Sequence, residues 1–221
     1  MKKSLLVFLL SVALVVPVFA ATSTKKVVSK QETKKETKFD IVGKIGLTIN
    51  PQIKTYTDYY EYDFSGNAKN SFMVGVEGLY KFDDKISAGI GINYISAADF
   101  DTNMDCYWDD YGSKMSIGFT NIYATIKPKL SDSIYAIAQI GYGVPNFKCA
   151  KLGGEKFWDV SSGGIYGGLG AGVEYKSFIF EAIYSVNSAN IESKYYNYPD
   201  TIDDVFRYST LSVNIGYKFS L

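Results

Sequence analysis

The sequence predicts an all-β protein that folds as an eight-stranded antiparallel up-and-down transmembrane β-barrel. Apolar and polar residues alternate over eight stretches of about 11 residues, and successive side chains of a β-strand point to opposite faces. The clearest stretch is Leu211–Leu221, where every odd position is large and apolar and every even position is Ser, Asn, Gly or Lys. Because this pattern recurs along the chain, we interpret the last stretch as the closing strand of a barrel.

The amino terminus has the features of a secretory signal peptide. Met1-Lys2-Lys3 is followed by an apolar run from Leu5 to Phe19 and by small residues at Ala20 and Ala21. The run is too short to span a bilayer comfortably, so we expect residues 1–20 to be removed after export through the Sec pathway. An uncleaved membrane anchor is the alternative.

Residues 21–38 predict a basic, disordered periplasmic tail, and residues 39–221 a single barrel domain. The tail is rich in Lys, Thr, Ser and Glu and cannot bury enough apolar surface to fold alone. It is either a solvated spacer or a contact for an anionic neighbour, such as cell-wall polymer or lipid head groups. Without the two lysines of the signal peptide, 21 basic residues (23 less two) face 23 acidic ones, which argues against nucleic acid as a partner.

The alternation sets the expected strand boundaries. In chain order the predicted strands are Phe39–Ile49, Phe72–Phe82, Ile86–Ser96, Thr120–Leu130, Ile134–Val144, Ile165–Tyr175, Phe178–Ser188 and Leu211–Leu221. Turns of two or three residues alternate with polar stretches of about 20 residues, so the two ends of the barrel are unlike each other. These polar stretches, expected as long extracellular loops, are residues 50–71, 97–119, 145–164 and 189–208. Strands of this length suit a tilted crossing of a hydrocarbon layer.

Alternation alone leaves open whether the apolar face meets lipid or lines the cavity of a secreted lipocalin-like barrel. Three features favour lipid. Aromatic residues of the apolar face gather near the strand ends, as interfacial girdles do, and the two barrel ends differ. The polar face carries the small residues that a narrow lumen needs: Gly75, Gly89, Gly91, Gly141, Gly143, Gly168, Gly170, Gly172 and Gly216.

Residues Phe39–Leu221 resemble a known family, the small eight-stranded outer-membrane barrels of the OmpA/OmpX type, also described as outer membrane protein β-barrel domain or porin-family proteins. In this chain, Tyr217 and Phe219 resemble the family's carboxyl-terminal signal, which the outer-membrane assembly machinery reads. Ser220 and Leu221 follow the aromatic residue that usually ends this signal, a minor departure because Leu221 keeps the alternation. The resemblance implies location in the cell outer membrane, with outer-membrane lipid and the assembly machinery as partners.

Charged residues on the polar face are expected in the lumen. Lys44 and Glu77 lie at matching heights on neighbouring predicted strands, and a buried charge needs a partner, so we predict an ion pair between them. Further charges are predicted to extend the polar interior toward the periplasmic side: Lys127, Glu174, Glu181 and Lys218. The set is either a plug of paired charges that fixes the barrel register or a gated narrow ion pathway, because eight-stranded lumens are normally filled by side chains.

No enzyme, cofactor or metal site is predicted. Small outer-membrane enzymes of the architecture that the chain resembles use histidine, and the chain contains 0 histidines. Asp99–Asp110 has oxygen ligands at alternating positions, but Met104 replaces the glycine and Asp110 the glutamate of a calcium loop, so a solvated acidic loop is expected.

The predicted function is therefore structural, in envelope integrity, or adhesin-like, in contact with a host surface or another surface. The loops are rich in Tyr, Asn and Asp, a composition that suits surface contact but also suits ordinary solvated loops. A narrow ion-conducting channel and a secreted ligand-binding barrel are the alternatives.

The two cysteines are predicted to form a disulfide. Cys106 and Cys149 lie in the second and third polar stretches, at the same expected end of the barrel of an exported chain. Peptide mapping without reductant is expected to find one peptide that links the two residues, and Cys106→Ser to abolish it. Alkylation of two free thiols in the untreated membrane protein would contradict the pairing.

Overall fold

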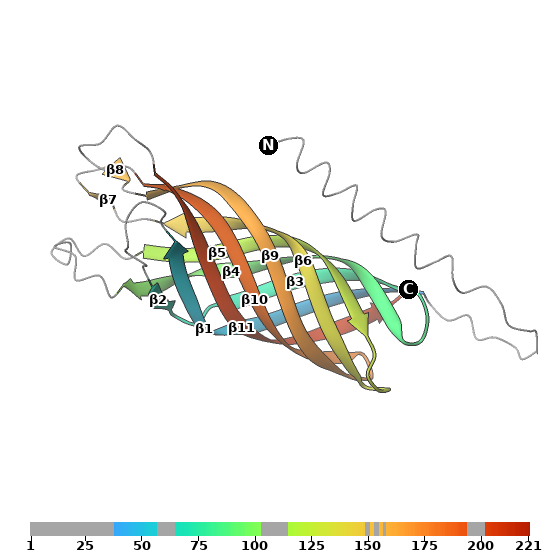
Figure 1. The fold of residues 1–221 in the computed structure, drawn as a ribbon. Coiled ribbons are helices and arrows are strands. Elements are labelled where there is room, and N and C mark those ends of the chain that lie inside the picture. Colours follow the sequence, from blue (N-terminus) through green and yellow to red (C-terminus); the bar gives the residue numbers. More distant parts are fainter. Residues whose placement is uncertain are drawn as a thin grey trace, which may run out of the picture. The chain divides into compact units, whose positions relative to one another are not determined.

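The computed structural model describes residues 38–56, 65–102, 115–148, 151–152, 155–156, 158–193 and 202–221. Residue contacts separate Met1–Lys38 from Phe39–Leu221, and the second unit is the barrel. In the described part of the chain, no helix is long and apolar enough to cross a membrane. The described elements are, in chain order (Figure 1), β1 (Phe39–Tyr56), β2 (Ser65–Ala68), β3 (Phe72–Lys81), β4 (Ile86–Thr102), β5 (Met115–Pro128), β6 (Ile134–Lys148), β7 (Lys151–Leu152), β8 (Glu155–Lys156), β9 (Trp158–Tyr175), β10 (Phe178–Ser193) and β11 (Ile202–Ser220).

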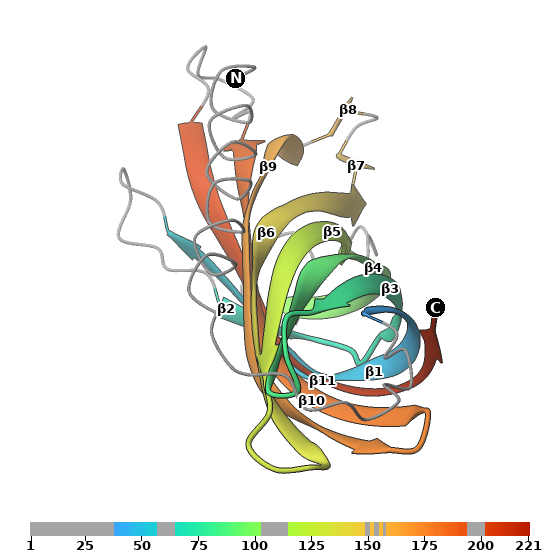
Figure 2. The ribbon, with the colours of Figure 1, turned by 90° about the vertical axis from the view of Figure 1, so that its right-hand side faces the viewer.

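The sheet closes on itself because β1 pairs with both β3 and β11, all antiparallel. In Figure 2, blue β1 lies beside red β11 and joins the two ends of the sheet. The sheet has nine strands, but β2 and β3 both lie between β1 and β4, one beyond the other, so the wall has eight strand positions. The predicted eight-stranded antiparallel up-and-down barrel is confirmed. The short β7 and β8 pair separately with each other.

The apolar face of the wall points outward. Ile165 and Leu169, on the outer face of β9, are 70% and 69% exposed, while Lys44, Glu77 and Asn121 are buried inside. A secreted barrel with an apolar ligand cavity would have its apolar face inside and its polar face outside, so that alternative is wrong. Short turns, residues 82–85, 129–133 and 176–177, join β3 to β4, β5 to β6 and β9 to β10. In the last of these turns Lys176 has a φ of 57°, which a two-residue hairpin turn requires.

The strands are longer than the sequence pattern predicts, and this corrects the predicted loop boundaries. Strands expected to end at Ile49, Ser96, Val144 and Ser188 continue to residues 56, 102, 148 and 193. In these extensions the polarity of the two faces is inverted. Apolar side chains point inward and form a buried cluster, here called the apolar cap: Ile53, Ala68, Ala98, Ile117, Phe119, Ala189, Phe206 and Tyr208.

A β-bulge explains why the pattern of β1 does not continue in phase. The register of β1 against β11 shifts between Ile49 and Gln52, and Asn50 has a φ of 48°. Before the bulge even-numbered side chains such as Thr48 are buried, and after it the odd-numbered Ile53 is buried. One extra residue exchanges the two faces of a strand. The alternation in the sequence is therefore interrupted at the bulge, although the strand continues beyond it.

Inward glycines make room for inward tyrosine rings. A Cβ at Gly172 would lie 2.4 Å from Cζ of Tyr135, and a Cβ at Gly91 would lie 2.7 Å from Cζ of Tyr123. Outward Gly167, also on β9, would meet nothing within 4 Å. The glycines of the polar face thus allow large rings to lie flat against the wall of a narrow lumen.

Alanine at Gly172 and at Gly167 is expected to have different effects. Gly172→Ala forces the Tyr135 ring away from the wall and lowers the free energy of unfolding by about 1–3 kcal/mol. Gly167→Ala, the matched control on the same strand, leaves it unchanged or raises it by up to about 1 kcal/mol. Urea unfolding of the barrel in lipid vesicles measures both, and equal effects of the two variants would contradict the packing.

Candidate functional site

Four charged side chains meet in the lumen in a closed ring, here called the charge quartet: Lys44 of β1, Glu77 of β3, Lys127 of β5 and Glu181 of β10. Lys44 Nζ lies 2.5 Å from Glu77 Oε1 and 3.0 Å from Glu181 Oε2. Lys127 Nζ lies 2.6 Å from Glu77 Oε2 and 2.6 Å from Glu181 Oε1. Each ammonium therefore binds both carboxylates, and every carboxylate oxygen has an ammonium partner. The ring has no net charge.

Strand register brings the quartet together. On neighbouring strands, Lys44 is paired with Gly75 and Val42 with Glu77, so the two charged residues are diagonal neighbours on the inner face. On the other side of β1, Lys44 is opposite Gly216 of β11, and β10 follows β11 in the wall. Lys44 Nζ reaches Glu181 on this next strand, and a Cβ at Gly216 would lie 2.8 Å from Cγ1 of Ile179.

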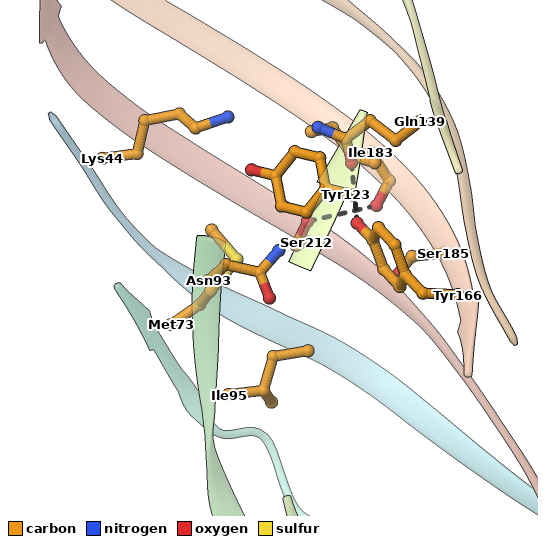
Figure 3. A pocket seen from close by; sticks show the side chains of 10 residues that line it. All are labelled: Lys44, Met73, Asn93, Ile95, Tyr123, Gln139, Tyr166, Ile183, Ser185 and Ser212. Atoms are coloured by element: carbon orange, nitrogen blue, oxygen red, sulfur yellow. Dashed lines mark hydrogen bonds between the residues drawn. The ribbon is translucent and has the colours of Figure 1, made fainter. Parts of the chain in front are cut away.

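Polar side chains complete the surroundings of the carboxylates. Tyr123 Oη donates a hydrogen bond to Glu77 Oε1 at 3.0 Å, and Tyr135 Oη to Glu181 Oε1 at 3.0 Å. Gln139 Nε2 donates to Glu77 Oε1 at 3.2 Å and accepts at Oε1 from Tyr166 Oη at 2.6 Å (Figure 3). Burial of charge is tolerated only when partners and hydrogen bonds replace water. This network supplies both, so the quartet is a structural element as it stands.

Other layers fill the described lumen on both sides of the quartet. Toward the short turns, Val42, Leu79 and Ile179 form a buried apolar layer. Away from the short turns lie the buried amides Asn93, Asn121 and Asn187, and beyond them the apolar cap, while the buried Asn214 is directly opposite Glu181 in the sheet. Between quartet and amides is a cavity of about 10 Å³ (Figure 3), roughly the space for one water centre.

The structure brings Lys44 and Glu77 together, but it places two of the further charges differently from the expectation. Lys127 and Glu181 were expected nearer the periplasmic side and instead complete the ring around the Lys44–Glu77 pair, because their long side chains span a narrow lumen. Glu174 and Lys218 pair with each other near the short-turn end, where their side chains are 26% and 16% exposed.

Sequence reasoning missed several residues of the lumen. Asp40 is held near the short-turn end by Lys81, 3.0 Å away, and by the hydroxyl of Ser220, which donates at 2.6 Å. The sequence also did not predict Tyr123 and Tyr135 as hydrogen-bond donors to the carboxylates. Tyr123 lies an even number of residues from Lys127 on β5, and Tyr135 an even number from Gln139 on β6, so each points to the same inner face. This spacing is the signal that would have identified them.

The remaining predicted residues lie outside this site. Cys106, Cys149 and most of the acidic stretch fall outside the described residues. Among the side chains that are described, no group of three His, Cys, Asp or Glu residues could hold a metal. Tyr217 and Phe219 are exposed on the outer face of β11, with ring centroids 4.7 Å apart, and Tyr217 also contacts Phe178. Their role as an assembly signal stays a prediction.

Removing one charge from the quartet is expected to be costly. Lys127→Met leaves two buried carboxylates with one ammonium and lowers the free energy of unfolding by about 3–5 kcal/mol. Adding Glu181→Gln removes the uncompensated charge and recovers part of the loss. The matched control, Glu174→Gln in the partly exposed pair, costs about 0–1 kcal/mol. Urea unfolding in vesicles measures the two single variants and the double variant. A double-variant loss equal to the sum of the two single losses would rule out coupling within the quartet.

Comparison with known proteins agrees on the fold. No family model matches the sequence, and no curated protein matches it either. The outer membrane protein OprG from Pseudomonas aeruginosa is 12% identical, with a TM-score of 0.52 over 84% of this chain and 98% of that one. Outer membrane protein AlkL, determined in lipid bilayers, is 10% identical, with a TM-score of 0.54 over 89% and 98% of the two chains. The chain thus has the fold of the small eight-stranded outer-membrane β-barrels.

Proposed function

We propose that this chain is an integral outer-membrane protein whose filled barrel anchors surface segments and does not conduct solutes. The single observation that carries the proposal is the combination of an apolar outer wall with a closed charge quartet inside it. The first requires an apolar solvent, and the second removes the water path that a channel needs. The role that follows is envelope integrity or contact with another surface.

The outer wall supports a position in lipid. Large apolar side chains cover the outer face on every strand position, many of them more than 40% exposed. Such a surface is far larger than the apolar patches that soluble proteins expose. Aromatic rings gather near the short-turn end of the outer wall, where Tyr80 contacts Phe82 and Tyr217 contacts Phe178. Rings at this depth are typical of the boundary between hydrocarbon and head groups.

The lumen supports the absence of conduction. The quartet leaves no carboxylate oxygen or ammonium without an oppositely charged partner. Layers of mainly apolar side chains lie toward the short turns and in the strand extensions. An ion would have to displace charged side chains and cross both apolar layers.

The connecting segments support a surface role. Residues 57–64, 103–114 and 194–201 join strands at the end opposite the short turns, and they are rich in Tyr, Asp and Asn. Side chains of these types are common in surfaces that recognise proteins. Replacing these segments in a strain that displays the protein is the test of adhesion: binding to host cells or matrix should be lost, while the barrel stays in the membrane.

Reconstitution in planar bilayers tests the barrel itself. The protein should show a heat-dependent shift on a detergent gel, which establishes the folded barrel, and should give no conductance steps under conditions in which a general porin does. Discrete steps that change in size with Glu77→Gln would overturn the proposal in favour of the narrow channel. Recovery in the soluble fraction without a gel shift would overturn the membrane assignment.

A further inference from the structure

We propose that the lumen binds two buried water molecules between the charge quartet and the apolar cap. One fills the cavity beside the quartet, and the other joins the unpartnered amide groups of Asn121 and Asn187. The inference goes beyond the proposed function, because it depends only on the interior of the barrel and not on what surrounds the wall.

Two buried amides need a hydrogen-bond partner. Asn121 and Asn187 are both 0% exposed. Within the described part of the chain, Asn121 Oδ1 and both polar atoms of the Asn187 amide have no hydrogen-bond partner. The other amide atom of Asn121, Nδ2, donates to Asn93 Oδ1 at 2.8 Å, so Oδ1 is the atom left over. A buried polar group without a partner is costly, and ordered water is the ligand that buried groups of this kind usually bind.

The two amides converge on one place, beside the Cα atom of Gly143. A Cβ at this residue would lie 2.6 Å from Asn121 Oδ1 and 2.5 Å from Asn187 Oδ1. Asn121 is directly opposite Gly143 in the sheet, whereas Asn187 reaches the same place from β10. Two carbonyl oxygens that face one place repel each other, and a water that donates one hydrogen to each replaces this repulsion by two hydrogen bonds. Phe119 of the apolar cap borders the place, because its Cδ1 would lie 3.4 Å from the same Cβ.

The cavity beside the quartet has room for the other water. Its volume is about 10 Å³, and its polar lining includes Asn93, Tyr166, Ser185 and Ser212 (Figure 3). A cavity holds water when it is polar and has space for one molecule, and this cavity meets both conditions. It also adjoins the two amides. Tyr166 is directly opposite Asn187 in the sheet, and Ser185 precedes Asn187 by two residues on the same inner face.

Hydrogen bonds connect this part of the lumen to the quartet. Asn121 donates to Asn93, which lines the cavity together with Tyr166. Tyr166 Oη donates to Gln139 Oε1 at 2.6 Å, and Gln139 Nε2 donates to Glu77 Oε1 at 3.2 Å. Water at the level of the amides therefore belongs to the network that surrounds the quartet.

Water fits these groups better than a metal cation does. Both polar atoms of the Asn187 amide are unpartnered within the described residues, so either its oxygen or its nitrogen can face Asn121. Water accepts from a nitrogen as readily as it donates to an oxygen. A hard cation such as calcium takes about six or more oxygen ligands. The positively charged Lys44 also lines the adjoining cavity and would repel a cation there.

Solution NMR of the folded protein in lipid nanodiscs tests both water positions. Cross-relaxation with water is measured at the isotope-labelled side-chain amides, where Asn187 reports on the shared water and Asn93 on the cavity water. Both should show a cross-peak to water in the wild type. Gly143→Ala places a methyl group against the two amide oxygens, so the cross-peak of Asn187 should be lost while that of Asn93 remains. The matched control is Gly167→Ala, whose methyl group meets nothing within 4 Å and which should keep both cross-peaks.

Four other outcomes would overturn the inference. A wild type without the Asn187 cross-peak has no shared water, and one without the Asn93 cross-peak has a dry cavity. A coupling across a hydrogen bond between the amides of Asn187 and Asn121 would show that the two bind each other directly. An Asn187 cross-peak that persists in Gly143→Ala would place the water elsewhere.

A heat-dependent gel shift shows which variants are folded. If Gly143→Ala does not fold, the crystal structure of the wild type decides, because it needs no variant. A density peak within hydrogen-bond distance of both Asn121 and Asn187 is the expected result, and direct contact between the two amides would refute the shared water.

Discussion

The interior of an eight-stranded barrel is so narrow that side chains must fill it, and the rest of this structure depends on that constraint. Every charge that the inner face carries must find its partner within the lumen. The quartet satisfies this with two lysines and two glutamates from four different strands. Glycines opposite these long side chains and opposite the tyrosine rings provide the necessary space. The polar interior therefore holds the wall in one register and leaves the outer face free to be wholly apolar.

The wall changes its chemistry partway along its length, while its hydrogen bonding continues. In the part with the short turns the outside is apolar and the inside polar, which suits lipid outside. In the extensions the inside is apolar, with Phe119 and Tyr208 in ring contact 5.3 Å apart, and cations such as Lys54 lie outside. That arrangement is the one expected of a protein in water. One continuous sheet thus has the polarity expected in lipid over one part and the polarity expected in water over the other.

The sequence predicted the part of the fold in which apolar and polar residues alternate without interruption. The fold class and the strand order follow from alternation, which also places Lys44, Glu77, Lys127 and Glu181 on one face. That this face points inward followed from the glycines of the polar face, the aromatic residues near the strand ends and the unlike barrel ends. Alternation cannot predict which inward charges meet, because lysine and glutamate reach across strands to distances that depend on barrel width. It also cannot follow β1 past Asn50, where the bulge exchanges the faces. The extensions were taken for loops for a related reason: they bury their apolar residues on the opposite face, so a polar outer surface resembles a solvated loop.

Closure of the wall joins the two most distant parts of the barrel. The other pairings in the wall link strands that are consecutive or separated only by short strands of the described chain, whereas β1 pairs with β11, with Ile41 opposite Phe219. A contact of such high sequence separation carries the largest loop-closure entropy and forms slowly. Lys44 meets Glu181 across β11, so this link of the quartet exists only once the last strand is in place. The topology therefore favours one order of folding. Hairpins can form early and locally, but the ion pairs of the quartet are complete only after the carboxyl-terminal strand has been added.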